Sequence, residues 1–542
     1  MKKLNTTNKN YTTNEKCFQL QIPMNLNIII PDNDSVRLLS QFVEEMDLTC
    51  LYETYSMFKE NQVTPRQMLK IILYAYLDGK YSSREIERAC HRDINYMYLL
   101  EGKPVPDHAT IARFRSLHFS PCAKHLLTQC TELLFEIGEI SGKNIFIDGT
   151  KIEANANKYT FVWKKAVTKN QEKFGEKAAA LAAECVETYA LKPVWHGKVN
   201  IKTLKKLRKK LYAIKEQECI EFVYGSGKRK TSLQKHIEQL EACLEKLKEY
   251  NHKIHVCGKR NSYSKTDTDA TFMRMKEDAM KNGQLKPAYN LQHGIDAEYV
   301  VWLEALPNTT DTPTLIPFLE DMQQNLSLKY MNIVADAGYE SEENYSYIEE
   351  HGHYAYIKPS NYEISKTRKY QADISNRENM VYDEEKDCYR CSQGNLLKAA
   401  GTRQRQTASG YIATKVIYKC SDCTDCPVKS RCIKGNHWKI PESERFKSLE
   451  VSRKFERQRA ESLKRITSQQ GIVLSINRRI QSEGSFADLK WDRGFKRFLC
   501  RGSGNVYAEC VLLAISHNIE KLHNKIQHEK TGEYLHCEDK VA

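Results

Sequence analysis

Two short apolar segments that each end in an aspartate constrain the fold of this sequence most. The first, KNIFIDGTKIEA, ends its apolar run at Asp148, and the second, MNIVADAG, ends its run at Asp336. Short apolar runs bounded by small residues predict buried strands. Helical patterns separate the strands, which predicts an α/β domain. Ligands and metal ions bind beyond the strand ends of such sheets, so both aspartates are candidate site residues.

The chemistry of paired strand-end carboxylates points to phosphate. A hard divalent cation such as Mg²⁺ takes a few carboxylates and leaves its other positions to water and phosphate oxygens. Two such aspartates therefore suit phosphodiester chemistry. The alternative is that each aspartate merely caps a turn. Lys and Arg outnumber Asp and Glu by 83 to 69, a net charge of +14, which favours a polyanionic partner without identifying one.

A third acidic candidate lies in the C-terminal part of the chain. Arg479, Glu483 and Lys490 are separated by three and six residues in RRIQSEGSFADLKWDRGFKRF. In a continuous helix, these spacings would place the three side chains on nearly one face. Glu483 could then bind metal while the two cations hold DNA phosphates. Taken alone, the pattern is equally that of an ordinary surface salt-bridge ladder.

The N-terminal region predicts short capped helices with basic residues. Thr64 starts a helix with a capping box and a proline in the first turn, and Ser82 and Asp107 start two more. These helices carry four arginines that are candidate DNA contacts: Arg84, Arg88, Arg113 and Arg115. The pattern suits a helix-turn-helix-like DNA-binding module. A plain helical bundle with solvated arginines is the alternative.

Two segments of the chain depart from the α/β pattern. Residues 160–250 form long charged helical patterns, and residues 198–215 hold eight Lys and Arg and no acid. That run predicts a DNA-backbone contact or a solvated helix face. Residues 361–440 are polar and cysteine-rich, which predicts an insertion. The expected organisation is a polar tail with a short strand-like stretch at 1–35, a helical DNA-binding domain at 36–135, an α/β catalytic domain at 143–360 and 443–528 with insertions at 160–250 and 361–440, and a tail at 529–542.

Six of the eighteen cysteines lie between positions 388 and 432. Cys388 and Cys391 form one C-x₂-C pair, and Cys420, Cys423, Cys426 and Cys432 form C-x₂-C-x₂-C-x₅-C. Such pairs can place thiolates around tetrahedral Zn²⁺, and the metal would supply folding energy to a polar insertion. An iron–sulfur cluster and unligated reduced thiols are the alternatives.

Several blocks of the sequence together resemble the DDE transposases of bacterial insertion sequences. The family signature is a tyrosine, two residues, an arginine, three residues, a glutamate, six residues and a lysine. Arg479, Glu483 and Lys490 match this spacing, and Ile476 stands at the tyrosine position. Four longer blocks resemble one transposase group in the same order: SREIERACHRDINYMYLLEGKPVPDHATIARFR, IFIDGTKIEANANKYTF, VADAGYESEENY and GFKRFLCRGSGNVYAECVLLAISHNIEKL.

The resemblance covers much of residues 36–524 and is weakest over 160–250. It implies an RNase H-like catalytic domain in which Asp148, Asp336 and Glu483 hold two Mg²⁺ ions, or Mn²⁺, for DNA cleavage and strand transfer. It also implies that Arg479 and Lys490 bind phosphates. The expected partners are the terminal inverted repeats of an element and its target DNA, bound by a homo-oligomer of at least two chains.

The same transposase group carries cysteine motifs that correspond to part of the insertion. The resemblance implies that Cys391, Cys423, Cys426 and Cys432 form the zinc set, with Cys388 and Cys420 as alternates. A nuclease without strand transfer and a catalytically silent DNA-binding descendant are the rival functions.

Several other functions lack support in the sequence. There is no Walker loop or dinucleotide fingerprint, so no nucleotide cofactor is expected. The polar N-terminus has no signal-peptide pattern and no apolar run reaches membrane-spanning length, so a cytoplasmic protein is expected. His293 and Asp296 in NLQHGIDAEY could form an active-site edge, but a turn between two strands explains them adequately.

Overall fold

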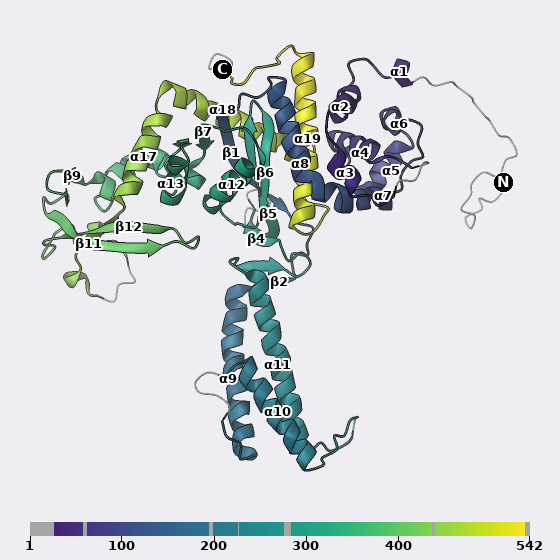
Figure 1. The fold of residues 1–542 in the computed structure, drawn as a ribbon. Helices are drawn as coiled ribbons and strands as arrows, with labels where there is room; N and C mark the ends of the chain where they lie inside the picture. The colour runs from purple at the N-terminus through teal and green to yellow at the C-terminus, as the bar shows by residue number, and fades with distance from the viewer. Residues whose placement is uncertain are drawn as a thin grey trace, which may run out of the picture.

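A computed structural model of the chain describes residues 26–57, 62–193, 199–225, 227–275, 283–435 and 440–536 (Figure 1). Of the expected N-terminal tail, residues 1–25 lie outside the described residues, and the part that is described contains the short helix α1 (Leu26–Ile29). The expected C-terminal tail is described as far as residue 536. No helix in these described ranges has the length and apolar character needed to span a membrane.

A six-stranded mixed sheet lies at the centre of the molecule (Figure 1). β1 pairs in parallel with β7, which pairs in parallel with β8. On its other side β1 pairs antiparallel with β5, and both β4 and β6 pair antiparallel with β5. The strands are β1 (Asn144–Glu153), β4 (Thr271–Arg274), β5 (Leu285–Asp296), β6 (Tyr299–Leu306), β7 (Asn332–Ala335) and β8 (Tyr354–Ile357). The predicted mixed α/β class is confirmed.

Helices cover both faces of this sheet. Alternate residues of β1 point to opposite faces and pack against different helices. Ile145 and Ile147 belong to the large core that includes α12 (Leu315–Asn325) and α13 (Glu342–Glu350). Phe146 belongs to a separate cluster with residues of α17 (Arg453–Ile466) and α18 (Gln469–Ala487). Near-continuous apolar sequence in β1 is therefore what a strand covered on both faces requires.

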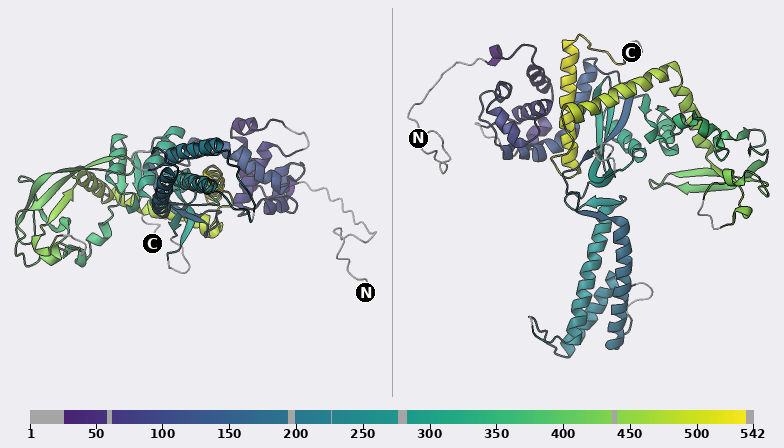
Figure 2. Two further views of the ribbon diagram at one scale, coloured as in Figure 1. Left: turned by 90° about the horizontal axis from the view of Figure 1, so that it is seen from below. Right: turned by 180° about the vertical axis from the view of Figure 1, so that it is seen from behind.

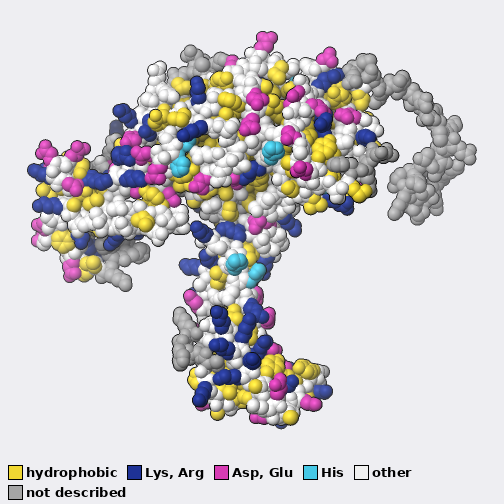
Figure 3. Space-filling model, in the orientation of Figure 1, with side chains coloured by type: hydrophobic (Ala, Val, Ile, Leu, Met, Phe, Trp, Pro, Cys, Tyr) yellow, Lys and Arg dark blue, Asp and Glu magenta, His cyan; other side chains and the backbone are white. Residues whose placement is uncertain are grey.

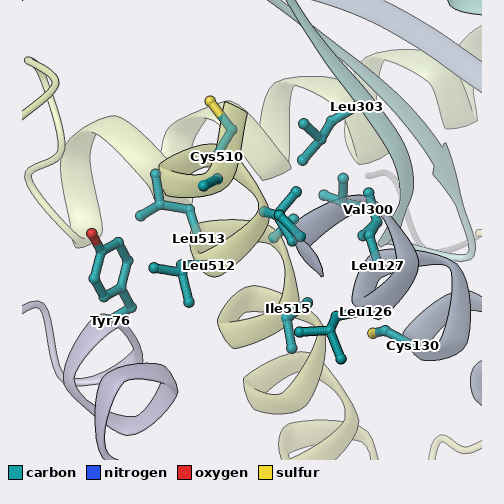
Figure 4. Packing of buried hydrophobic residues seen from close by; sticks show 14 of the residues in the cluster. Tyr76, Leu126, Leu127, Cys130, Val300, Leu303, Cys510, Leu512, Leu513 and Ile515 are labelled. Carbon is teal, nitrogen blue, oxygen red and sulfur yellow. The ribbon is translucent and has the colours of Figure 1, made fainter. Parts of the chain in front are cut away.

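The N-terminal helices pack directly against the C-terminal helix α19 and the central sheet. α19 (Ser503–Gln527) contacts α4, α8 and β6, and its side chains fill the space between them (Figure 4). The predicted capping box is present, since Thr64 accepts from the Gln67 backbone and Gln67 accepts from the Thr64 backbone. The helices of this region are α2 (Ser35–Glu44), α3 (Thr49–Glu53), α4 (Pro65–Leu77), α5 (Ser83–Cys90), α6 (Ile94–Leu100), α7 (His108–Arg113), the π-helix η1 (Phe114–Phe119) and α8 (Ser120–Glu136).

The charged segment forms a stalk of three helices, α9 (Lys164–Thr188), α10 (Ile201–Gln217) and α11 (Ser232–Cys257). It projects from the body beyond the two-stranded sheet of β2 (Phe161–Trp163) and β3 (Ser262–Ser264) (Figures 1 and 2). The helices share their own apolar core. The segment was expected to be an insertion of long charged helices over 160–250, and its last helix continues to Cys257.

The cysteine-rich insertion is built on a five-stranded antiparallel sheet. Its strands are β9 (Val381–Asp383), β10 (Cys388–Arg390), β11 (Leu396–Gln406), β12 (Ile412–Cys420) and β13 (Ser448–Val451). Short helices flank the sheet: α14 (Tyr362–Ser365), α15 (Arg368–Gln371), η4 (Arg377–Asn379), α16 (Lys429–Cys432) and η5 (Glu442–Glu444). β13 pairs with β12 and so extends the sheet of the insertion to Val451, beyond the expected end at residue 440. The sheet lacked a sequence signal because most of β11 is exposed and has no apolar alternation.

Candidate active site

The register of the central sheet brings two of the predicted site residues together. The last parallel pair of β1 and β7 is Ile147 with Ala335, and the next residues along the chain are Asp148 and Asp336. Asp148 is bonded to its neighbour, since the Gly149 amide donates to its Oδ1 at 2.8 Å. Asp336 caps the short helix η3 (Ala337–Tyr339) by accepting from the Gly338 amide at 2.8 Å. Both aspartates therefore lie at the same edge of the sheet.

Helix α18 lies over this edge and supplies a basic residue that the sequence signature did not single out. α18 contacts β1, β5 and β7. Arg478 of α18 donates from Nη1 to Oδ2 of Asp148 at 3.2 Å, and each side chain is 17% exposed. A cavity of about 340 Å³ next to this pair is lined by Asp336, Arg478 and Arg479, together with residues of β7, β8 and α17. The cavity is the opening through which a phosphate group could reach Asp336.

The three residues of the C-terminal signature occupy different surroundings. Arg479 and Glu483 are exposed on α18, and Glu483 makes no hydrogen bond or ion pair with the described residues. Lys490 lies in the π-helix η6 (Asp488–Asp492) and is 8% exposed. The expectation that all three share one helical face is wrong for Lys490, because the α-helix ends at Ala487 and the wider π-turn changes the spacing of the following side chains.

Asp311 is a further carboxylate at this edge, and sequence analysis missed it. It accepts hydrogen bonds from Asn290 Nδ2 at 2.7 Å and Gln292 Nε2 at 3.3 Å, both in β5. A side chain at Gly149 would come within 2.8 Å of Asp311 Oδ1, and one at Gly338 within 3.5 Å of Asp311 Oδ2. These glycines thus let the Asp311 carboxylate approach the backbone beside both Asp148 and Asp336. Only the pairing of β5 with β1 reveals this proximity.

Two buried aromatic groups reflect the electrostatics of the edge. Burial raises the pKa of the Tyr339 phenol well above its usual value, and the nearby charges of Asp148, Asp311 and Asp336 raise it further. Burial lowers the pKa of His293 to about 3. His293 lies opposite Asp148 in β5 and stacks on Phe486 of α18, so the expected turn at His293 is wrong. A neutral imidazole therefore lies beside Asp148 without adding charge.

The chemistry of this edge fits a divalent cation in part. Carboxylate oxygens are the ligands that Mg²⁺ prefers, and Asp148 and Asp336 present them at neighbouring strand ends. Among the described residues, however, no three His, Cys, Asp or Glu side chains are grouped as a metal site. Glu483 is therefore not in position beside the two aspartates in this conformation.

The four predicted N-terminal arginines divide into two groups. Arg84, Arg88 and Arg113 are exposed on α5 and α7. Arg115 is 6% exposed and donates to Tyr76, Tyr81 and Ser83, at 2.8 to 3.0 Å. Arg115 therefore holds the helical region together, and its side chain is directed into that region.

Five of the six clustered cysteines line one small cavity of about 20 Å³ in the insertion. They are Cys391, Cys420, Cys423, Cys426 and Cys432. Burial raises the pKa of Cys420 to about 12, and the neighbouring thiols Cys423 and Cys391 contribute. Cys388 lies outside this lining, within β10. The cysteines face a common space, but their side chains are not grouped as a closed metal site.

Two family models match the chain. Residues 390–523 match the transposase DDE domain, and residues 24–117 match the transposase domain DUF772. The matches indicate a transposase function. They lie at the N- and C-terminal positions expected of a DDE transposase, and the resemblance seen in the motifs is confirmed. Neither the comparison with curated proteins nor that with solved structures gives a match.

The matched ranges cover some of the candidate residues and leave others outside. The C-terminal match includes α18 with Arg478 and Glu483, and the N-terminal match includes α5 and α7. Asp148, Asp336 and the stalk lie outside both ranges. DDE transposases bind DNA, use divalent metal ions and typically act as oligomers.

Proposed function

We propose that this chain is a DNA transposase that cleaves the ends of an insertion element and transfers the 3′-hydroxyl strands into target DNA. The observation that carries the proposal is the position of Asp148 and Asp336 at adjacent parallel strand ends, beneath the helix that bears the signature glutamate. The strand order, with antiparallel β5 and β6 on one side of β1 and parallel β7 and β8 on the other, supports an RNase H-like catalytic domain.

Asp148, Asp336 and Glu483 would together hold two Mg²⁺ or Mn²⁺ ions. Bound there, the ions would activate water or a 3′-hydroxyl and stabilise the leaving oxygen. Because Glu483 lies exposed on α18, its helix must shift toward the sheet to complete this set. Arg479 and Lys490 are the proposed phosphate contacts, and the exposure of Arg479 makes it the more accessible of the two.

The N-terminal helices are the proposed reader of the terminal inverted repeats. Arg84, Arg88 and Arg113 are exposed, and Arg88 and Arg92 line an open surface hollow of about 570 Å³ together with Lys80. Cationic side chains around such a hollow can contact DNA phosphates. The active complex is proposed to be a homo-oligomer of at least two chains, because two element ends must be held together.

The insertion is the proposed site of one structural Zn²⁺. Support comes from the common cavity that Cys391, Cys423, Cys426 and Cys432 line, with Cys420 beside them. Thiolates at C-x₂-C spacing, here Cys423 and Cys426, are typical ligands of structural zinc. Zinc bound there would join the end of β10 to the segment that follows β12.

A nuclease without strand transfer uses the same carboxylates, and a silent descendant would retain only DNA binding. All three acids are present, which favours a catalytic protein. The test incubates the purified protein with Mg²⁺ and a duplex that carries the element end, and follows both nicking and joining to a second duplex. We expect Asp336→Asn and Asp148→Asn to bind this duplex but not cut it. Nicking without joining would favour the nuclease, and unimpaired cutting by Asp336→Asn would refute the site.

A further inference from the structure

The stalk carries most of the excess positive charge of the chain. Residues 164–257 contain 21 Lys and Arg against 11 Asp and Glu, so this segment contributes +10 of the net +14. Figure 3 shows Lys and Arg side chains gathered on the visible face of the stalk. The charge is thus concentrated on the part of the chain that neither family model matches.

Within the stalk, the free charge is concentrated on α10. Leu204, Leu207 and Leu211 of α10 are fully buried in the stalk core. Four lysines of α10 each lie two residues before or after Leu204 or Leu207. Two residues correspond to a rotation of about 200° around a helix, so these lysines point away from the core. They are Lys202, Lys205, Lys206 and Lys209, and all four are exposed.

The lysines of α11 provide an internal comparison. Lys246 pairs with Glu249 at 2.7 Å, Lys248 pairs with Glu245 at 2.6 Å, and Lys253 also pairs with Glu249. In contrast, the four lysines of α10 make no ion pair or hydrogen bond with any described residue. Intrahelical ion pairs stabilise a helix slightly. A lysine face that serves only solubility would therefore gain from acids placed beside its lysines, as on α11.

We propose that the lysine face of α10, formed by Lys202, Lys205, Lys206 and Lys209, binds the phosphate backbone of double-stranded DNA outside the catalytic site. The face spans eight residues, or about 10 Å of helix, over which one strand of B-DNA presents about three phosphates. Lysine ammonium groups on flexible stems act as point charges toward phosphates, so this contact reads no base sequence. The stalk thereby holds DNA that extends from the body, at a distance from Asp148 and Asp336.

The proposal rests on the proposed transposase function for the identity of the DNA, and the test separates the two. The full-length protein is titrated with a duplex of arbitrary sequence, without Mg²⁺, at several salt concentrations. The quadruple variant Lys202→Ala, Lys205→Ala, Lys206→Ala and Lys209→Ala is compared with the control variant Lys246→Ala, Lys248→Ala and Lys253→Ala. Each lost phosphate contact lowers the salt slope by about 0.9, so we expect a fall of about two to three units for the first and less than about one for the second.

A second readout needs no substitution. Chemical acetylation of the wild-type protein should be slowed by DNA at Lys202, Lys206 and Lys209 and not at Lys246 or Lys248. A quadruple variant that keeps the wild-type salt slope, or equal protection of both helices, overturns the stalk proposal even if element ends are still cut. A reduced slope in a protein that never cuts DNA supports the stalk contact and refutes the transposase proposal. Absence of any DNA binding by the wild type refutes both.

Discussion

Arg478 and Asp148 form an ion pair that joins helix α18 to the end of strand β1, with 3.2 Å between Nη1 and Oδ2. The Arg478 guanidinium occupies Oδ2 of Asp148, so a divalent cation that binds this oxygen has to displace it. Without metal, it partly neutralises the charge that accumulates at the edge where Asp148, Asp311 and Asp336 lie close to Tyr339. The position of α18, which carries Glu483, therefore depends on the charge of the carboxylates at this edge.

The first prediction follows from this pair. Arg478→Ala should lower the free energy of unfolding by about 1–2 kcal/mol in the absence of divalent metal, because it leaves a half-buried carboxylate without its partner. Mg²⁺ should restore more stability to this variant than to the wild type, since the ion no longer competes with a guanidinium. Denaturant titrations with EDTA and with Mg²⁺ measure both effects. Arg479→Ala is the matched control, and an equal Mg²⁺ effect in all three proteins would contradict the competition.

The second prediction concerns Glu483. Glu483→Gln should abolish cleavage of element-end DNA and change the free energy of unfolding by less than about 0.5 kcal/mol, because the side chain is exposed and has no partner among the described residues. Glu461→Gln changes a partly exposed acid on the neighbouring helix α17 that pairs with Arg457 and Arg465, and this variant should retain cleavage. Strand nicking and equilibrium unfolding are measured on the same preparations. If Glu483→Gln cut DNA at the wild-type rate, the third acid would have to be sought elsewhere, with Asp311 as the nearest candidate.

Local signals explain what the sequence could predict. Strand-end aspartates, the capping box at Thr64 and the cap at Asp107 depend on a few neighbouring residues, and the structure contains each of them. Contacts that depend on packing of distant segments gave no such signal. Arg478 rather than Arg479 reaches Asp148 because of how α18 packs on β1, and Asp311 approaches the edge only through β5.

The same reasoning explains two errors of boundary and orientation. The π-turn after Ala487 removed Lys490 from the face shared by Arg479 and Glu483, and no residue type marks such a turn. The strand β13 is four residues long and only one of them is buried, so it lacks a strand pattern of its own. β13 forms because its backbone pairs with the edge of β12.

The third prediction concerns Asp311 as the acceptor beneath the site. Asp311→Ala should destabilise the protein by about 1–3 kcal/mol, because the fully buried amides of Asn290 and Gln292 lose an acceptor. Asp311→Asn keeps one oxygen and should cost less. Comparing the unfolding of the two variants with that of the wild type measures the difference. Equal losses in both would mean that the charge, and not the hydrogen bonding, stabilises this region.

The fourth prediction concerns the cysteine cavity. Protein prepared without oxygen should contain about one zinc per chain, and replacing Cys423 and Cys426 together by serine should release it. The insertion should then lose local structure while α19 and the central sheet remain folded, because the insertion has a separate core. Metal analysis and protease sensitivity of residues 381–451 report the two effects. Iron with sulfide in place of zinc would indicate a cluster, and the absence of both metals would leave only reduced thiols.

The last prediction concerns Glu304, which lies beside Asp321 in the core between β6 and α12. Burial and the adjacent Asp321 carboxylate raise the pKa of Glu304 to about 8, against the opposing effect of Lys124. Lys124 also pairs with Asp321 at 2.5 Å, and Trp302 donates to Asp321 at 3.2 Å. Glu304 therefore holds a proton near neutral pH, more tightly in the folded protein than in the unfolded chain.

The sign of the resulting pH dependence follows from proton linkage. Between the ordinary glutamate pKa of 4.5 and the folded value of about 8, folded Glu304 is protonated while unfolded Glu304 is ionised. Stability must therefore fall as the pH rises through this window, by at most about 1.4 kcal/mol per pH unit. Glu304→Gln cannot ionise, so its stability should fall less between pH 5 and pH 8, relative to the wild type. Glu320→Gln, an exposed acid on α12, is the control and should follow the wild-type curve. Parallel curves for the wild type and Glu304→Gln in denaturant titrations would show that no proton is held at this pair.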